Sequence, residues 1–210
     1  MGTCCCTLRK QKSIQYNEVI HYRNKTYSVL NDQLGKGHYG IVYKGLINQK
    51  HNCAIKVIPK KKFTISELKA LELIHLHSHN NILHVYSVFR FKTYYYIISN
   101  ICPGSELYDK IHDKTITEIQ AYKIMKQLLL AIDHLHSIGI IHRDIKPENI
   151  MISNTFTIKV IDLGLAKIES DIIYHKNKCR RLKQVGTPYY LDPNVIKQYY
   201  SELCDEWSAG

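Results

Sequence analysis

Short runs of β-branched and aromatic residues alternate with turn residues in the first half of the chain. These runs are YSVLNDQLGKGHYGIVYKGLI (27–47), HNCAIKVIPK (51–60), ILHVYSVFRF (82–91) and TYYYIISNI (93–101). Such a pattern is typical of a small antiparallel sheet. The segment up to about Thr26 is polar and shows no sustained period. We therefore expect an N-terminal extension over residues 1–26 and a β-rich lobe over residues 27–101.

One helix interrupts the predicted sheet, and helices dominate after it. In ISELKALELIHL (65–76) apolar residues recur at helical spacing, with Ser66 as the expected cap. After CPGS (102–105) the helical period continues in ELYDKI (106–111) and ITEIQAYKIMKQLLLAIDHLHSIG (116–139), where Gly139 is a stop signal. The expected apolar stripe of the long helix is Ala121, Ile124, Met125, Leu128, Leu129, Ile132 and Leu135. CPGS therefore joins the sheet to a helix-rich lobe over residues 102–210, which gives an α+β fold.

Composition is that of an ordinary globular protein, with 45% hydrophobic and 22% charged residues. No apolar run approaches the ~18 residues that a membrane span needs. The net charge of +11 is spread along the chain, which favours a basic surface and predicts no nucleic-acid partner. The seven cysteines lack paired metal-ligand spacing, and the sequence has no secretory signal. Reduced thiols and a cytoplasmic location are therefore expected.

The loop IIHRDIKPENIM (140–151) concentrates polar chemistry between the long helix and a predicted hairpin, NIMI and FTIKVIDLG. It resembles the protein kinase catalytic loop, His-Arg-Asp-x-Lys-Pro-x-Asn. The resemblance implies that Asp144 orients the substrate hydroxyl and accepts its proton. It also implies that Lys146 neutralises charge on the transferring phosphoryl group and that Asn149 holds a Mg²⁺ ion. In such a reaction positioned charge supplies most of the catalysis.

Two motifs in the β-rich lobe are similar to the ATP-binding parts of the same family. LGKGHYGIV (34–42) carries Gly35, Gly37 and Gly40 in the G-x-G-x-x-G-x-V pattern between two strand-like runs. Glycines there let backbone N–H groups approach the phosphates of ATP. CAIK (53–56) matches the V-A-I-K strand, so the resemblance implies that Lys56 bridges the α- and β-phosphates.

The acid that partners Lys56 is expected on the interrupting helix. ELKALELI resembles the acid-bearing helix of the family, in which the residues four and seven positions after the acid face the core. Glu67 is therefore the first choice, because Leu71 and Ile74 then occupy those positions. Glu72 is the alternative.

Two motifs of the helix-rich lobe match the family with substitutions. IDLG (161–164) stands where the family has Asp-Phe-Gly, so Asp162 is the second expected Mg²⁺ ligand and Leu163 replaces the phenylalanine. GTPYYLDPN (186–194) resembles the end of an activation segment, with Thr187 placed to support Asp144 and Lys146. Lys146 and this run favour serine/threonine over tyrosine specificity. The family's Ala-Pro-Glu is replaced by Asp-Pro-Asn at residues 192–194.

The adenine end of the ATP site is expected along YYYIISNICPGSEL (94–107). Counting back from the Pro-Gly turn puts Cys102 at the hinge that bonds adenine and Ser99 at the gatekeeper position. A shift of one residue would instead place Ile98 or Asn100 at the gatekeeper. The cofactor-binding set that the resemblance implies is completed by Leu34, Val42, Ala54, Met151 and Glu106.

Within the kinases, GSELYDKI and YYSELCDEWSAG look most like the calcium- and calmodulin-dependent group, including the calcium-dependent kinases of protists and plants. The chain has no EF-hand pattern. Glu106 and Glu148 match carboxylates that receive arginines upstream of the acceptor, so basic protein substrates are expected. The chain ends at CDEWSAG, where the family begins a central helix of the large lobe, so we expect an incomplete large lobe. A pseudokinase or nucleotide-binding scaffold without catalysis is the alternative function.

The N-terminal sequence MGTCCC suggests acylation. Gly2 would become N-terminal after Met1 is removed, and Cys4, Cys5 and Cys6 are candidates for palmitoylation. Two acyl signals anchor a protein stably, whereas one does so only marginally. Membrane association is therefore expected in addition to the cytoplasmic location.

Overall fold

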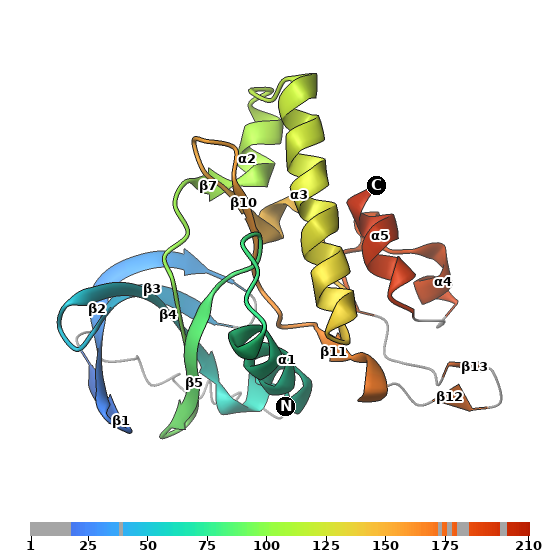
Figure 1. Cartoon of the computed structure of the whole chain (residues 1–210). Coiled ribbons are helices and arrows are strands. Elements are labelled where there is room, and N and C mark those ends of the chain that lie inside the picture. Colours follow the sequence, from blue (N-terminus) through green and yellow to red (C-terminus); the bar gives the residue numbers. More distant parts are fainter. Residues whose placement is uncertain (1–17, 38–39, 172–173, 176–177, 180–184, 198–200) are drawn as a thin grey trace, which may run out of the picture.

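A computed structural model describes residues 18–37, 40–171, 174–175, 178–179, 185–197 and 201–210. A curled sheet comes first along the chain and a helix-rich part follows it (Figure 1). The segment after the last strand of the sheet crosses between the two parts at the position predicted for the CPGS joint. The α+β class expected from the sequence is confirmed.

The sheet has six antiparallel strands in the order β1-β2-β3-β4-β6-β5. The first predicted run divides into β2 and β3 around the glycine-rich loop. The sheet begins inside the segment that the sequence assigned to the extension. Its first strand was not predicted, because a strand of four residues is too short to show a period. The strands are β1 Val19–Tyr22, β2 Lys25–Lys36, β3 Ile41–Ile47, β4 His51–Pro59, β5 Val85–Phe91 and β6 Tyr94–Ser99.

The sheet is curled so that its two edge strands approach each other. β1 and β5 lie at opposite ends of the strand order, yet the rings of Tyr22 and Phe89 stack with centroids 4.3 Å apart. Just before β1, the carboxylate of Glu18 accepts a hydrogen bond from the Tyr96 hydroxyl at 3.0 Å and pairs with Lys92 at 2.7 Å. The inside of the curl is filled by an apolar cluster that includes Ile20, Tyr27, Val29, Tyr43, Ile55, Phe89 and Tyr96.

Helix α1 (Ile65–Leu76) occupies the predicted range. Its cap is Thr64, whose hydroxyl accepts a hydrogen bond from the Glu67 backbone N–H at 3.0 Å. Ser66, the expected cap, lies within the first turn, so that expectation was wrong. The buried face of α1 joins the main apolar core together with strand residues, through Ala70, Leu71, Ile74, Ile58 and Ile97.

The helix-rich part is built around α3 (Glu118–Ser137), which begins with a capping box formed by Thr117 and Gln120. A hairpin of β9 and β10 follows it and pairs with β7. The other elements are short: η1 Lys60–Lys62, β7 Ser105–Glu106, α2 Leu107–His112, β8 Ile140–Ile141, η2 Pro147–Asn149, β9 Ile150–Ile152, β10 Ile158–Val160, β11 Lys167–Ile168, η3 Glu169–Asp171, β12 Tyr174–His175, β13 Lys178–Cys179, η4 Pro188–Tyr190, α4 Pro193–Ile196 and α5 Leu203–Ala209.

The buried stripe of α3 is narrower than the sequence predicted. It consists of Ile124, Leu128, Ala131, Ile132 and Leu135. Ala121, Met125 and Leu129 were expected in the stripe but are exposed, Met125 by 38% and Leu129 by 47%. Ala121 lies in the first turns of the helix. Met125 and Leu129 each follow a buried residue by one position, and one position turns the helix by about 100°, away from the core. Gly139 has φ +75°, which matches its predicted role as the residue that stops the helix.

Candidate active site

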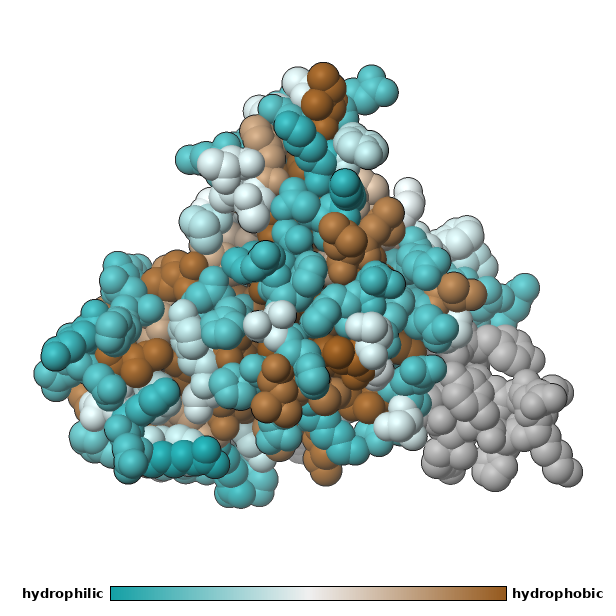
Figure 2. Space-filling model, in the orientation of Figure 1, coloured by the Kyte–Doolittle hydropathy of each residue, from teal (hydrophilic) through white to brown (hydrophobic). Residues whose placement is uncertain are grey.

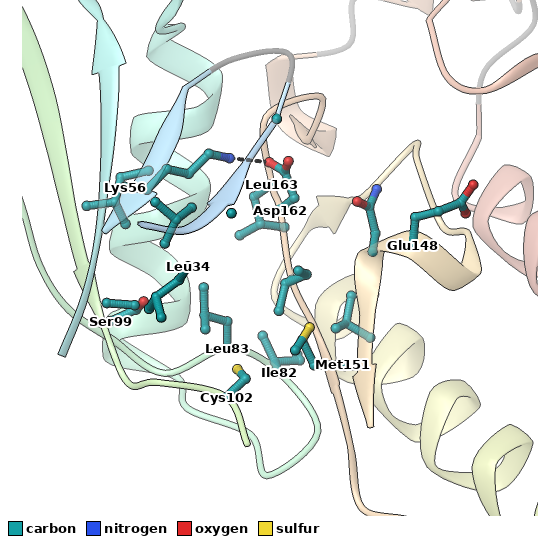
Figure 3. A pocket seen from close by; sticks show the side chains of 18 of the residues that line it. Leu34, Lys56, Ile82, Leu83, Ser99, Cys102, Glu148, Met151, Asp162 and Leu163 are labelled. Atoms are coloured by element: carbon teal, nitrogen blue, oxygen red, sulfur yellow. Dashed lines mark hydrogen bonds and ion pairs between the residues drawn. The ribbon is translucent and has the colours of Figure 1, made fainter. Parts of the chain in front are cut away.

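A cavity of about 500 Å³ lies between the curled sheet and the helix-rich part (Figure 3). It collects side chains from β2, β3, β4, α1, the hinge and the loops around β9 and β10. Its lining contains every residue of the expected cofactor-binding set: Leu34, Gly35, Gly37, Gly40, Val42, Ala54, Lys56, Ser99, Cys102, Glu106, Met151 and Asp162. Of the expected catalytic residues, Lys56, Glu67, Asp144, Lys146 and Asn149 also line it.

The three glycines of the loop between β2 and β3 differ in what surrounds them. A Cβ added at Gly35 or Gly37 would meet no atom of the described residues within 4 Å, so the described part of the chain leaves the space beside this backbone open to the cavity. A Cβ at Gly40 would clash with the carbonyl oxygen of Val57. Gly35 and Gly37 therefore leave room for a ligand, whereas Gly40 allows β3 to pack closely on β4.

The hinge end of the cavity is lined by Ser99, Asn100 and Cys102. Ser99 is 6% exposed and pairs with Ala54 across β4 and β6. The next residue, Asn100, is held by its backbone N–H, which donates to the His84 carbonyl at 3.0 Å, and by its side chain, which accepts from the His84 N–H. Cys102 lines the cavity beyond it, and burial raises the pKa of its thiol.

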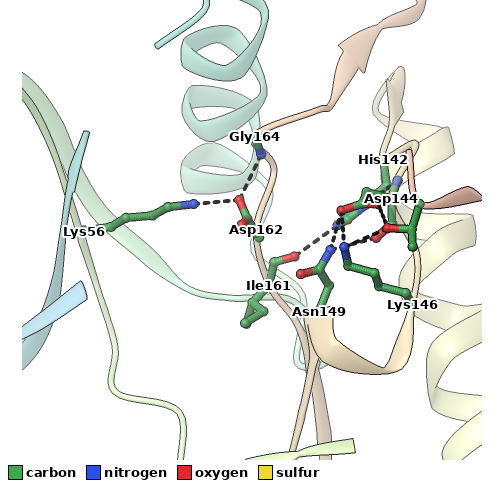
Figure 4. A network of polar contacts seen from close by, with 9 residues as sticks. Lys56, His142, Asp144, Lys146, Asn149, Ile161, Asp162 and Gly164 are labelled. Atoms are coloured by element: carbon green, nitrogen blue, oxygen red, sulfur yellow. Dashed lines mark hydrogen bonds and ion pairs between the residues drawn. The ribbon is translucent and has the colours of Figure 1, made fainter. Parts of the chain in front are cut away.

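Lys56 of β4 reaches across the cavity to Asp162. Its ammonium group lies 2.6 Å from Oδ1 of Asp162, which also accepts the Gly164 N–H at 3.1 Å (Figure 4). Burial alone would raise the pKa of Asp162, but the charge and hydrogen bond of Lys56 lower it below its usual value. Asp162 has φ +57°, a conformation that costs a non-glycine residue about 1–3 kcal/mol and is typical of functional sites.

Glu67 points toward the same cavity but does not share this ion pair. It is 1% exposed, and its Oε2 has no hydrogen-bond partner among the residues that the structure describes. Burial raises the pKa of Glu67 to about 7, despite the opposing charge of Lys56. Lys56 instead pairs with the more exposed Asp162, which loses less hydration when it is ionised. Glu72, the alternative partner, is exposed on the other side of α1.

Hydrogen bonds connect three expected residues of the loop 140–151, two of them through Thr187. Lys146 Nζ donates to the Thr187 hydroxyl at 2.8 Å, and that hydroxyl donates to Asp144 Oδ1 at 2.9 Å. The amide nitrogen of Asn149 donates to Asp144 Oδ2 and to the Asp144 carbonyl, both at 2.8 Å. These bonds fix the carboxylate of Asp144 from two sides and leave it within the cavity lining.

Asp205 of α5 anchors the start of this loop. Its side chain is completely buried and accepts the backbone N–H groups of His142 and Arg143, at 2.7 Å each. It also accepts a hydrogen bond from His136 Nε2 at 3.0 Å. Burial alone would lower the pKa of His136, but the hydrogen bond and charge of Asp205 raise it above its usual value. A charged acceptor thus holds a loop whose Arg143 has φ +66°.

Asn149 and Asp162 offer oxygen donors that suit Mg²⁺, which prefers hard oxygen ligands. Since the Asn149 nitrogen donates to Asp144, its amide oxygen is turned toward the side of the cavity where Asp162 lies (Figure 4). The low pKa of Asp162 keeps its carboxylate ionised at neutral pH. Both residues line the cavity, so the donor set fits the expected ion.

A pair of acids flanks the cavity on the side of α2. Glu106 ends β7 and Glu148 lies in η2, and both line the cavity. Burial, Asp109 and Glu148 all raise the pKa of Glu106. The Oε2 atom of Glu148 is buried and has no hydrogen-bond partner among the described residues.

Part of the lining was not identified from the sequence. Ile82 and Leu83 come from the connection between α1 and β5, and Val160 comes from β10. These residues carry no motif, and an apolar residue in a loop or a strand gives no signal that it faces a cavity. Leu163, identified as a substitution in the motif, packs in the main core and is 6% exposed.

Comparisons with known proteins match most of the chain. A family model described as protein kinase domain matches residues 28–210. Calcium-dependent protein kinase 5 of Plasmodium berghei (strain Anka) is 39% identical over 198 residues, covering 89% of this chain and 33% of that protein. Calcium-dependent protein kinase 4 of Plasmodium falciparum (isolate 3D7) is 38% identical, covering 84% of this chain and 34% of that protein. The chain thus spans about a third of the length of these relatives.

Proposed function

The chain belongs to the protein kinase family, and from this premise we propose that it transfers the γ-phosphoryl group of ATP to serine and threonine hydroxyls of proteins. The observation that carries the proposal is the contact of Thr187 with both Asp144 and Lys146. It holds a carboxylate and an ammonium group side by side at the cavity, where a hydroxyl acceptor and a phosphoryl group would meet.

The roles of the residues follow from their atoms. Asp144 Oδ2 is 3.1 Å from Lys146 Nζ, so a substrate hydroxyl bound at Asp144 also lies near a positive charge. Asp144 accepts the hydroxyl proton, and Lys146 stabilises negative charge on the phosphoryl oxygens. Lys56 contacts the phosphates, with Glu67 as its proposed partner in that complex. Bound ATP would supply the phosphoryl group. A Mg²⁺ ion would neutralise its charge, and Asn149 and Asp162 would hold this ion.

We test this activity on the full chain, with radiolabelled ATP and a generic basic peptide. Asp144→Asn is expected to lower the rate at least about 100-fold, since general base catalysis contributes about 10²–10⁴-fold. The same variant should still bind nucleotide, as measured by calorimetry. Retained binding would show that its fold is intact. If the unsubstituted chain binds nucleotide but transfers no phosphate above the Asp144→Asn background, the chain is the nucleotide-binding scaffold that the sequence left as the alternative.

The proposed substrates carry arginine upstream of the acceptor residue. Glu106 and Glu148 place two carboxyl groups beside the cavity. The buried Oε2 atom of Glu148 lacks a hydrogen-bond partner among the described residues, and the guanidinium group of an arginine would supply one. We expect Glu148→Gln to weaken the preference for Arg two or three residues before the acceptor by about tenfold, the effect of one charge-assisted hydrogen bond. A positional peptide library measures this. Glu169→Gln, an exposed acid on η3, is the matched control.

Membrane attachment through Gly2 and Cys4–Cys6 is also a proposal, and these residues lie outside the described part of the chain. Among the described residues, no helix has the length and apolar character to cross a bilayer. Metabolic labelling with a clickable myristate tests the proposal. We expect a signal that disappears in Gly2→Ala, and a signal that persists in that variant would overturn acylation at Gly2.

A further inference from the structure

Basic side chains gather at the end of the sheet farthest from the hinge. Strand β6 starts beside this end and finishes at Ser99, so its six residues separate the two by about 20 Å. The lower margin of the space-filling view, below the sheet, is largely hydrophilic (Figure 2). We name this surface the basic tip, and its members are Arg23, Lys60, Lys61, Lys62, Arg90 and Lys92.

Backbone contacts bring these residues together from separate parts of the chain. The N–H of Lys60 donates to the carbonyl of Thr93 at 2.9 Å, which places η1 against the turn between β5 and β6. In the same turn, Arg90 Nε donates to the Lys92 carbonyl at 3.4 Å. The basic tip is therefore one surface and not a set of scattered lysines.

Arg23 belongs to the same surface because of the aromatic contact between the two edge strands of the sheet. The Arg23 guanidinium lies 5.5 Å from the centre of the Tyr22 ring, and that ring stacks on Phe89, the neighbour of Arg90 in β5. Curling of the sheet thus places the turn after β1 beside β5, although the two strands are at opposite edges of the strand order.

The basic tip carries a surplus of positive charge. Glu18 pairs with Lys92. The basic side chains of Lys60, Lys61 and Arg90 are exposed on the same surface. None of the three lines the cavity of the candidate active site, so ATP binding does not account for them.

The connection between the N-terminal cysteines and the basic tip points to a lipid surface as the partner. The described part of the chain starts at Glu18, which is held 2.7 Å from Lys92 at the basic tip. Eleven residues lie between Cys6 and Glu18, and the twelve Cα–Cα steps that join the two place Cys6 within about 43 Å of the tip even at full extension. Arg9, Lys10 and Lys12 add positive charge to this connection. An acyl chain on Cys6 would therefore hold a lipid surface within this distance of the tip.

We propose that the basic tip binds the surface of an anionic lipid bilayer. A basic residue near such a surface contributes about 1 kcal/mol, or about fivefold in affinity. One acyl chain alone binds a membrane marginally, and a basic patch on a folded domain supplies a second attraction. The proposal concerns the folded lobe and does not require that the N-terminus is acylated or that the chain is an active kinase.

The test uses the full chain without acylation and measures its co-sedimentation with vesicles. Vesicles of phosphatidylcholine alone are compared with vesicles that contain about 30% phosphatidylserine. The second composition represents an anionic leaflet. We expect binding to the anionic vesicles alone, and a decrease in binding as salt is raised. We expect the triple variant Lys60→Glu/Lys61→Glu/Arg90→Glu to bind on the order of 100-fold more weakly, because each of the three positions contributes about fivefold to the affinity.

The control reverses the same number of charges elsewhere. Lys114→Glu/Lys123→Glu/Lys126→Glu changes three exposed lysines in and before α3 and should retain binding. An equal loss in both triple variants would show that net charge alone is responsible, and this overturns the proposal. Unchanged binding of the first variant also overturns it. If the first variant instead loses affinity for a 20-base-pair DNA duplex while the unsubstituted chain shows no vesicle binding, the surface recognises nucleic acid and the proposal fails.

Discussion

The ammonium group of Lys56 lies 2.6 Å from Oδ1 of Asp162, and Glu67 remains buried beside this pair. Three ionisable groups from β4, α1 and the segment after β10 thus meet at one cavity. Only one carboxylate is paired with the lysine, so the other carries the larger cost of burial.

Glu67 should therefore make stability depend on pH. Its pKa is raised from 4.5 to about 7 in the folded chain, so the folded state binds more protons than the unfolded state between these values. Stability that is fully present below pH 4.5 is then lost as pH rises through about 7. The shift corresponds to about 3 kcal/mol. Glu67→Gln should remove this loss, as measured by urea denaturation at pH 5 and pH 8.

The control for this prediction lies on the same helix. Glu72→Gln changes an exposed carboxylate and should leave the difference between pH 5 and pH 8 as it is in the unsubstituted chain. A Glu67→Gln variant with an unchanged difference would contradict the assignment of the raised pKa.

Asp205→Asn should destabilise the chain by about 3 kcal/mol. The buried carboxylate of Asp205 accepts two backbone N–H groups. An asparagine would replace one of its acceptor oxygens with an N–H₂ donor, so a buried N–H would lose its acceptor, which is costly. The denaturation midpoint measures the effect. Glu206→Gln, at the exposed neighbouring position, should have little effect, and equal midpoints for the two variants would refute the anchoring role.

Thr187→Val should lower kcat about 10- to 100-fold and leave the KM for ATP nearly unchanged. Valine keeps the shape of threonine but removes the hydroxyl that links Lys146 to Asp144, and a hydrogen bond to a charged group contributes about 1.5–3 kcal/mol. Steady-state kinetics with the basic peptide measure both constants. Thr187→Ser retains the hydroxyl and should restore kcat, whereas a serine variant as slow as the valine variant would show that packing is the cause.

Ser99→Met should weaken binding of a bulky aryl pyrazolopyrimidine about 30-fold. Ser99 lines the cavity at its hinge end, beside Ala54, so a small side chain there leaves space for the aryl group. Burying that group contributes about 2 kcal/mol at ~25 cal/mol per Å². Calorimetry with each variant measures the affinity. Ser99→Ala should bind as the unsubstituted chain does, and equal affinities of the unsubstituted chain and the Ser99→Met variant would show that another residue limits the cavity.

The sequence predicted elements that have a strong local signal. Helix α1 occupies the range given by its apolar spacing, and Gly139 stops α3 as its position suggested. Strand β1 was missed, because four residues show no period and its stability depends on a ring of β5 that is distant in sequence. Met125 and Leu129 were wrongly assigned to the core, since apolar character alone does not fix the width of a buried face.

At the candidate site, motifs predicted which residues gather but not how they pair. Asp144, Lys146 and Thr187 meet as their motifs implied. The choice of Lys56 between Asp162 and Glu67 depends on the relative burial of two carboxylates that are 95 positions apart in the chain, which no local pattern records. Apolar residues such as Ile82 line the cavity because of the path of a loop, for which the sequence gives no signal.

The short strand β1 also determines where this chain can safely be shortened. The family match starts at residue 28, so residues before it look dispensable. Their removal would delete β1 and the first three residues of β2, would leave Ile47 of β3 without its partner Tyr27, and would uncover the face of Phe89 on which Tyr22 stacks. An open strand edge beside exposed aromatic surface is a site for pairing between molecules. Four residues outside the recognised domain thus protect the sheet against aggregation.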